Sequence, residues 1–126
     1  MKTLIFVPAR GGSKGIKNKN LVSIGNKKLI DFTLDICKKF DKSFFTFVST
    51  DSENISNHCK KRGFYNSYIR PAYLSTDKSN IIDALLHGLK WLNKKMNYEP
   101  DAVLLLQPTS PNRDIKQIKK AIKQFK

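Results

Sequence analysis

Residues 3–21 read TLIFVPARGGSKGIKNKNL. Thr3 to Val7 form a continuous run of strand-favouring residues, which is typical of a strand buried on both faces. After Pro8 come one arginine, three glycines and three lysines, without an acid among them. Glycines let the backbone turn sharply and bring N–H groups close to a ligand, and basic side chains attract anions. The stretch therefore predicts a buried strand that runs into a phosphate-binding loop, with a flexible basic surface loop as the alternative.

Strand-like and helix-like segments alternate along the rest of the chain. Further strands are expected at 44–48, 64–69 and 102–106, the last of them strongly buried, and apolar residues at helical spacing mark 29–40, 55–62, 82–96 and 115–125. Residues 49–52 suit the N-cap of the second helix, and Asp77 or Ser79 suits the cap of the third. The alternation predicts an α/β fold with an open, mostly parallel sheet and helices on both faces. No linker interrupts it, so a single domain spanning 1–126 is expected.

Composition narrows the classes of function. The net charge is +14, which by itself suggests a nucleic-acid partner, but lysines spread along every segment supply most of the basic residues. The short apolar run at the N-terminus suits neither a signal peptide nor a membrane span, so a cytoplasmic protein is expected. Cys37 and Cys59 have no metal-like spacing and are expected to be buried free thiols. His58 and His87 lie in helical patterns without a paired acid, so we interpret both as structural.

The loops that follow the strands carry the candidate chemistry. In an open parallel sheet, ligands bind beyond the carboxyl ends of the strands. The loop of Arg10, the turn at Thr50–Asp51, Arg70 and the loop 107–113 should therefore gather there. Arginine offers a planar fork that matches phosphate or carboxylate oxygens, although surface arginines in loops are the alternative. The glycine spacing fits neither a P-loop nor a dinucleotide fingerprint.

Four motifs in order resemble the acylneuraminate cytidylyltransferases, the family of CMP-sialic acid and CMP-nonulosonate synthetases. The motifs are IFVPARGGSKG with KNL behind it (5–15, 19–21), VSTD (48–51), RPA with Leu74 and Asp77, and LLQPTSP with Arg113. The resemblance implies a Rossmann-like nucleotidyltransferase fold. It also implies transfer of CMP from CTP to the anomeric hydroxyl of a nine-carbon 2-keto sugar acid, with release of pyrophosphate.

The same resemblance assigns roles to residues of this chain. The residues implied to bind the nucleotide are Arg10, Gly11, Gly12, Ser13, Lys14, Lys19, Asn20 and Arg70. Of these, Arg10, Lys14 and Lys19 are the implied catalytic residues, because charge neutralisation dominates such a reaction. The residues implied to face the sugar acid are Gln107, Thr109, Ser110 and Arg113. A turn role for Asn20 and a cap role for Ser110 stay open, and Thr50 and Asp51 suit a cap better than a catalytic pair.

The resemblance covers only the N-terminal half of the family's longer chains. Family members hold Mg²⁺ through an Asp-x-Asp cluster in the other half and pair as homodimers through it, so we expect a truncated chain without the metal ligands or the dimerisation part. Asp51, Asp77 and Asp101 do not match that cluster. One alternative is a non-catalytic basic module that binds nucleotides or nucleic acid, for which the sparse aromatic residues near the basic loop are unfavourable. Another alternative is an enzyme that acts on 3-deoxy-octulosonate. The corresponding loop of such enzymes lacks the GGSKG form that this chain has, which is unfavourable for that alternative.

Overall fold

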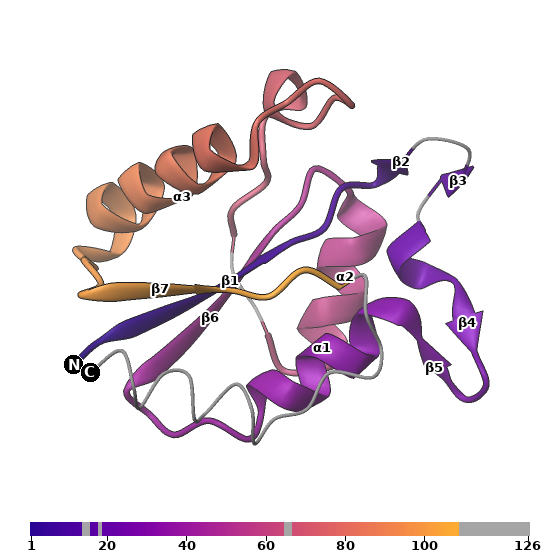
Figure 1. Ribbon diagram of the computed structural model, residues 1–126, viewed down its shortest axis with the longest axis horizontal. Coiled ribbons are helices and arrows are strands. Elements are labelled where there is room, and N and C mark those ends of the chain that lie inside the picture. Colours follow the sequence, from indigo (N-terminus) through magenta and orange to yellow (C-terminus); the bar gives the residue numbers. More distant parts are fainter. Residues whose placement is uncertain (14–15, 18, 65–66, 109–126) are drawn as a thin grey trace.

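A parallel three-stranded sheet forms the centre of the protein, whose computed structural model describes residues 1–13, 16–17, 19–64 and 67–108 (Figure 1). Its strands are β1 (Thr3–Pro8), β6 (Phe44–Ser49) and β7 (Ala102–Leu105), in the order β6-β1-β7. In the register, Ile5 lies opposite Thr46 on one side and Leu104 on the other. Three of the predicted strands are therefore confirmed.

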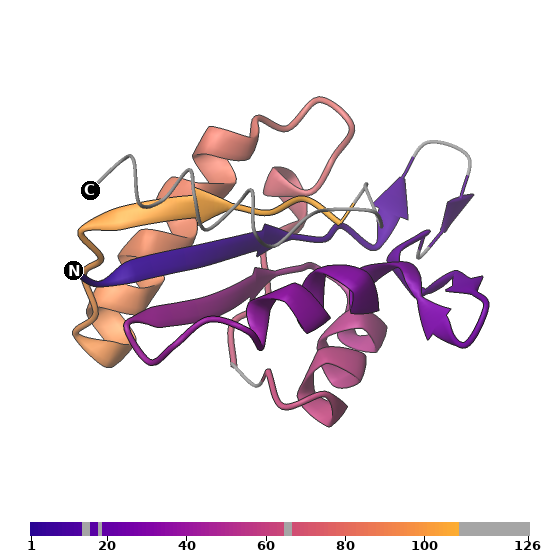
Figure 2. The same cartoon turned by 60° about the horizontal axis from the view of Figure 1, so that its bottom comes forward.

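Helices cover both faces of this sheet, as predicted (Figure 2). Helices α1 (Leu29–Cys37) and α2 (Glu53–Lys61) lie on one face, and α3 (Ile81–Met96) lies on the other. The shorter elements are two 3-10 helices, η1 (Lys19–Leu21) and η2 (Ala72–Leu74), and two small antiparallel pairs, β2 (Gly12–Ser13) with β3 (Ile16–Lys17) and β4 (Ser23–Ile24) with β5 (Lys27–Lys28).

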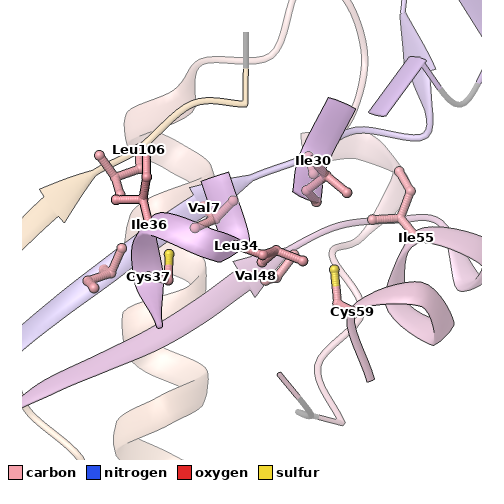
Figure 3. Close-up of a cluster of buried hydrophobic side chains, with 11 residues drawn as sticks. Val7, Ile30, Leu34, Ile36, Cys37, Val48, Ile55, Cys59 and Leu106 are labelled. Carbon is pink, nitrogen blue, oxygen red and sulfur yellow. The ribbon is translucent and has the colours of Figure 1, made fainter. Parts of the chain in front are cut away.

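Alternate side chains of β1 enter two separate cores, because successive residues of a strand point to opposite faces. Ile5 and Val7 pack under α1 and α2 with one apolar cluster, in which Figure 3 shows Leu34 and Cys59 beside Val48. The side chains in the core under α3 are Leu4, Phe6, Phe47, Tyr68, Ala84 and Leu92. β1 is thus buried on both faces, as its continuous apolar run predicts.

Helix α3 approaches the sheet closely at Gly88. A Cβ atom at this position would lie 2.9 Å from a ring carbon of Phe47. The helix begins at the cap Asn80, whose Oδ1 accepts the Ile82 N–H at 2.8 Å, so the expectation that Asp77 or Ser79 caps it is wrong. Helix α2 is capped by Ser52, within the predicted range.

The prediction of a strand at 64–69 is wrong. Phe64 and residues 67–70 have no regular structure. Arg70 donates its N–H to the Thr50 carbonyl at 2.8 Å, but Pro71 has no N–H with which a ladder could continue. Tyr68 is instead held by its ring, which packs 5.0 Å from that of Phe47 in the core under α3.

The strand expected at 102–106 is confirmed over Ala102–Leu105, but the expectation that it is strongly buried is wrong. Val103 is 38% exposed and Leu105 42%, while Ala102 and Leu104 are half-buried. Within the described residues β7 pairs only with β1, so it forms an edge of the sheet. The helix predicted at 115–125 lies outside the described residues.

Candidate functional site

A cleft of about 330 Å³ opens beyond the carboxyl ends of the strands. Its volume is at the lower end for small-molecule sites. Its walls come from the end of β1, from η1, from the segment 70–81 and from residues 107–108 behind β7. The charged or amide side chains that line it are Arg10, Lys19, Asn20, Arg70, Asp77, Asn80 and Gln107. Elements distant in the sequence thus meet at the sheet edge where a parallel fold places its ligand.

The Arg10 side chain lies at this cleft and reaches the opposite wall. Its Nη1 donates to Asp77 Oδ1 at 3.0 Å and to the Ser75 carbonyl at 3.4 Å. Its backbone carbonyl accepts a hydrogen bond from Asn20 Nδ2 at 3.2 Å. Asn20, which lies in η1, therefore ties that helix to the segment after β1, and it also lines the cleft.

Asp51 holds the first glycine of the loop, a role that the sequence interpretation missed. Its Oδ1 accepts the Gly11 N–H at 2.8 Å, across 40 positions of sequence. The expectation that Asp51 serves as a helix cap is therefore wrong, since Ser52 caps α2. The parallel register, in which Pro8 lies opposite Ser49, carries the two residues to the same place. One sequence signal could have revealed this role of Asp51. A carboxylate lies two positions after the end of one parallel strand, and a glycine loop follows the end of the neighbouring strand.

Arg70 is a buried cation in the wall of the cleft. It is 4% exposed, and its Nε and Nη2 donate to the hydroxyl and carbonyl of Ser49 at 2.9 and 2.8 Å, while Nη1 donates to the Leu74 carbonyl at 3.3 Å. Burial lowers the pKa of Arg70, which reflects the cost of keeping a cation from water. Among the described residues, no carboxylate forms an ion pair with it. The charge of Asp51 offsets part of this cost, and an anion bound in the cleft would offset more of it.

The structure brings together five of the predicted site residues. Arg10, Lys19, Asn20, Arg70 and Gln107 line one cleft. Gly11 and Gly12 belong to the adjoining loop, where Gly12 begins β2. The predicted residues that lie outside the described part, or whose side chains do, are Ser13, Lys14, Thr109, Ser110 and Arg113. Their assignments stay predictions.

A second charged cluster, away from the cleft, ties α1 to α2. Asp31 Oδ1 lies 2.6 Å from His58 Nε2 and 2.6 Å from Arg62 Nη1, and Arg62 also pairs with Asp35. The expectation that His58 has no acid partner is therefore wrong. Burial raises the pKa of Asp31, but the hydrogen bond from His58, the Lys28 backbone N–H and the nearby positive charges outweigh it and leave the pKa below its usual 3.8. The cluster joins two helices, and none of its members is among the described residues that line the cleft.

The second histidine and the two cysteines lie in or beside the apolar cores. His87 Nδ1 lies 2.9 Å from the Tyr68 hydroxyl in the core under α3, in keeping with a structural role. Cys37 and Cys59 are buried free thiols, as predicted, and burial raises the pKa of Cys59 to about 12.

The described residues do not fit a divalent cation. In this part of the chain, no three side chains of His, Cys, Asp or Glu lie close enough together to hold a metal ion. The two acids nearest the loop, Asp51 and Asp77, already bond Gly11 and Arg10. Among the helices described, none combines the length and apolar character that a bilayer crossing requires.

Comparison with known proteins agrees with the four motifs. A sequence profile described as "Cytidylyltransferase" matches residues 4–126. The N-acylneuraminate cytidylyltransferase of Escherichia coli O18:K1:H7 (strain RS218 / NMEC) is 35% identical over 124 residues, which are 98% of this chain and 28% of that protein. The CMP-N,N'-diacetyllegionaminic acid synthase of Legionella pneumophila is 34% identical over 126 residues, 100% of this chain and 54% of that protein.

A solved structure has the same fold. It is that of a CMP:2-keto-3-deoxy-manno-octonic acid synthetase complexed with CTP, and it superposes with a TM-score of 0.78 at 20% identity over 99% of this chain and 47% of that one. At this identity the likeness shows the fold alone, and it confirms the Rossmann-like fold with an open, mostly parallel sheet. The chain spans about half the length, or less, of these relatives. Matched from residue 4 to its last residue by the family profile, the chain belongs to the cytidylyltransferase family.

Proposed function

We propose that this chain forms the CTP-binding part of a cytidylyltransferase that transfers CMP from CTP to a nonulosonic acid and releases pyrophosphate. One observation carries the proposal: Arg10, Lys19 and Arg70 converge on one cleft at the strand ends, beside a glycine loop. A triphosphate is a ligand of matching charge, since basic donors bind phosphate oxygens strongly. Family membership selects the cytidine nucleotide among triphosphates.

The reaction needs little covalent chemistry from the protein. The sugar hydroxyl oxygen forms a bond to the α-phosphorus, the bond from that phosphorus to the bridging oxygen of pyrophosphate breaks, and the hydroxyl proton is lost. Negative charge grows on the phosphoryl oxygens and on the leaving group. In this proposal Arg10 and Lys19 neutralise that charge and hold the triphosphate in line, while the buried Arg70 fixes the wall of the site.

The sugar acid is proposed to lie on the side of the cleft formed by residues behind β7. Gln107 lines the cleft there, and Thr109, Ser110 and Arg113 follow it in the sequence. The names of two relatives, for N-acylneuraminate and for N,N'-diacetyllegionaminic acid, support the nonulosonic class of acceptor. Assistance by Mg²⁺ and pairing into a homodimer rest on the resemblance alone, and no step above passes through a metal. A cytoplasmic location is proposed from the short apolar run at the N-terminus.

Titration calorimetry of the 126-residue chain with CTP tests the proposal. We expect Arg10→Gln and Lys19→Gln each to weaken CTP binding by about tenfold to a hundredfold, the usual effect of removing a charged hydrogen bond. Lys94→Gln in the last turn of α3 is the matched control, because it removes the same charge far from the cleft and should leave CTP binding unchanged.

The same experiment separates the alternatives. ATP and inorganic triphosphate should bind more weakly than CTP, and equal binding of all three would refute the cytidylyltransferase assignment. A basic nucleic-acid module would instead bind a DNA or RNA duplex with steep salt dependence, and Arg10→Gln would leave that binding intact.

A further inference from the structure

Asp77 is the acidic side chain that lines the cleft, within the described residues. The cleft has three basic side chains, Arg10, Lys19 and Arg70, and Asp77 faces them from the segment behind η2. Its Oδ1 accepts a hydrogen bond from Arg10 Nη1 at 3.0 Å. A negative charge at this place opposes an anionic ligand, so its presence needs a physical reason.

Other roles for Asp77 do not fit its contacts. The cap of α3 is Asn80, so Asp77 does not satisfy the N-terminus of that helix. Asp77 belongs to no group of metal-binding side chains in the described chain. The hydrogen bonds that shape its turn join its neighbours and do not use its carboxylate. The Thr76 N–H donates to Ser79 Oγ at 2.9 Å, and the two hydroxyl groups lie 2.8 Å apart. The contact that the structure gives the carboxylate is with Arg10.

The ion pair is placed where a ligand can break it. The side chain of Asp77 is 61% exposed and that of Arg10 29%, so the pair lies at the open side of the cleft. Ion pairs in contact with water are weak. The oxygens of a phosphate group carry more negative charge than the Asp77 carboxylate and can accept the same hydrogen bond from Arg10. A phosphate in the cleft would also lie near Lys19 and Arg70.

We propose that Asp77 is an internal counter-ion of the phosphate site. Its carboxylate holds Arg10 while the cleft is empty, and the phosphates of the nucleotide take its place. The inference rests on the proposed function, because it needs an anion that binds at Arg10. Since Arg10 Nη1 also bonds the Ser75 carbonyl, the exchange loosens one of the ties between the glycine loop and the segment 75–77.

Asp77→Asn tests the inference, because it removes the charge and keeps a carbonyl oxygen that can accept from Arg10. Inorganic triphosphate, titrated into the 126-residue chain by calorimetry, should bind Asp77→Asn about two- to fivefold more tightly than the unchanged protein, as expected for loss of a competing exposed ion pair. Asp83→Asn is the matched control. It removes the same charge from the exposed first turn of α3, and we expect a smaller change there because no described contact joins Asp83 to Arg10.

A double variant isolates the pair. In an Arg10→Gln background, Asp77→Asn should raise the affinity for triphosphate no more than Asp83→Asn does. The guanidinium for which Asp77 and the phosphate compete is then absent. Weaker binding by Asp77→Asn would show that Asp77 positions Arg10 and would overturn the inference, as would an unchanged affinity or a gain equal to that of Asp83→Asn.

The two proposals fail in distinguishable ways. If the unchanged chain binds CTP and Asp77→Asn gains nothing, the counter-ion role fails and the proposed function stands. If the unchanged chain prefers no nucleotide but Asp77→Asn still gains affinity for triphosphate, the assignment to CTP fails and the counter-ion role stands. If neither protein binds triphosphate, both are overturned.

Discussion

Replacing Asp51 by alanine should destabilise the protein and weaken its anion site together. The carboxylate accepts the Gly11 N–H at 2.8 Å, and Gly11 is buried. In Asp51→Ala that N–H loses a charged acceptor in a place that water reaches poorly. The perturbation therefore tests whether the glycine loop is held from the neighbouring strand.

The size of the effect follows from this single bond. A hydrogen bond to a charged group contributes about 1.5–3 kcal/mol, and we take about 2 kcal/mol for Asp51→Ala because the acid itself is half-buried. An unfolding entropy of about 2.1 cal/mol/K per residue gives a chain of 126 residues a shift of about 4 °C per kcal/mol. Tm should therefore fall by about 8 °C. Asp51→Asn keeps an acceptor oxygen and should lose about half as much.

Asp101→Ala is a matched control for the thermal measurement. Asp101 Oδ2 also accepts a backbone N–H at 2.8 Å, that of Lys2, but this bond is exposed. Water can replace the lost acceptor there, so we expect a Tm change of only about 2 °C, in line with a weak exposed interaction. Equal losses for Asp51→Ala and Asp101→Ala, measured by circular dichroism melts, would refute the claim that Gly11 depends on a buried tether.

The affinity of Asp51→Ala for triphosphate is a second test, and we expect it to change in the direction opposite to that predicted from charge alone. Removing a negative charge near an anion site tightens binding on charge alone, whereas freeing the loop disorders its N–H donors. We expect the second effect to prevail, with binding about tenfold weaker in calorimetry, equivalent to about 1.4 kcal/mol. Tighter binding would show that the loop holds its shape without Asp51.

Three further predictions concern the two cores and the charged cluster. Gly88→Ala should lower the free energy of unfolding, measured in urea, by about 1 kcal/mol. The added methyl group would lie 2.9 Å from the Phe47 ring, and the cost of overpacking the core exceeds the gain in helix propensity. A more stable variant would contradict this. The folded-state pKa of Asp31 lies below 3.8, so its stabilisation is complete above that pH and is lost as the pH falls through the folded-state value. Urea unfolding of Asp31→Asn and the unchanged protein should therefore converge below pH 3.8, and a constant difference would contradict the assignment. Cys59, with a pKa raised to about 12, should resist a thiol reagent at pH 8 until urea unfolds the protein, and rapid labelling of the native state would disprove its burial.

The sequence predicted those parts of the fold that depend on local pattern. Every residue of the run Thr3–Val7 after Thr3 is apolar, which predicts a strand buried on both faces, and β1 is buried on both faces. The apolar run 102–105 has the same character, but in the described part of the chain it has a neighbouring strand on one side only and is partly exposed. Burial depends on neighbours that a local pattern does not contain. Residues 64–69 looked like a strand, yet Tyr68 is held by aromatic packing and Pro71 ends any ladder.

The residues of the site also fall into some that the sequence could predict and some that it could not. Arg10 could be predicted because a basic residue behind a strand end has a general meaning in parallel sheets. Lys19 was assigned through the resemblance, and Arg70 was expected to follow a strand at 64–69 that the described residues do not form. Asp51 and Asp77 were assigned to helix caps, since an acid before a helix is most often a cap. Their true partners, Gly11 and Arg10, lie 40 and 67 positions away, and only the strand register and the path of the segment 70–80 bring them close.

The central place of β1 also determines when the protein can fold during its synthesis. β1 is made first, but its neighbour β7 is made last of the three strands, and Lys2 bonds Asp101 across 99 positions. Such distant contacts raise the contact order, which slows folding, because a long chain segment must close before the contact forms. Until α3 has left the ribosome, Leu4 and Phe6 have no helix over them, and a nascent chain is open to aggregation on that face. The described lining of the cleft reaches residue 108, so the cleft cannot be complete before the last of the described residues has been translated.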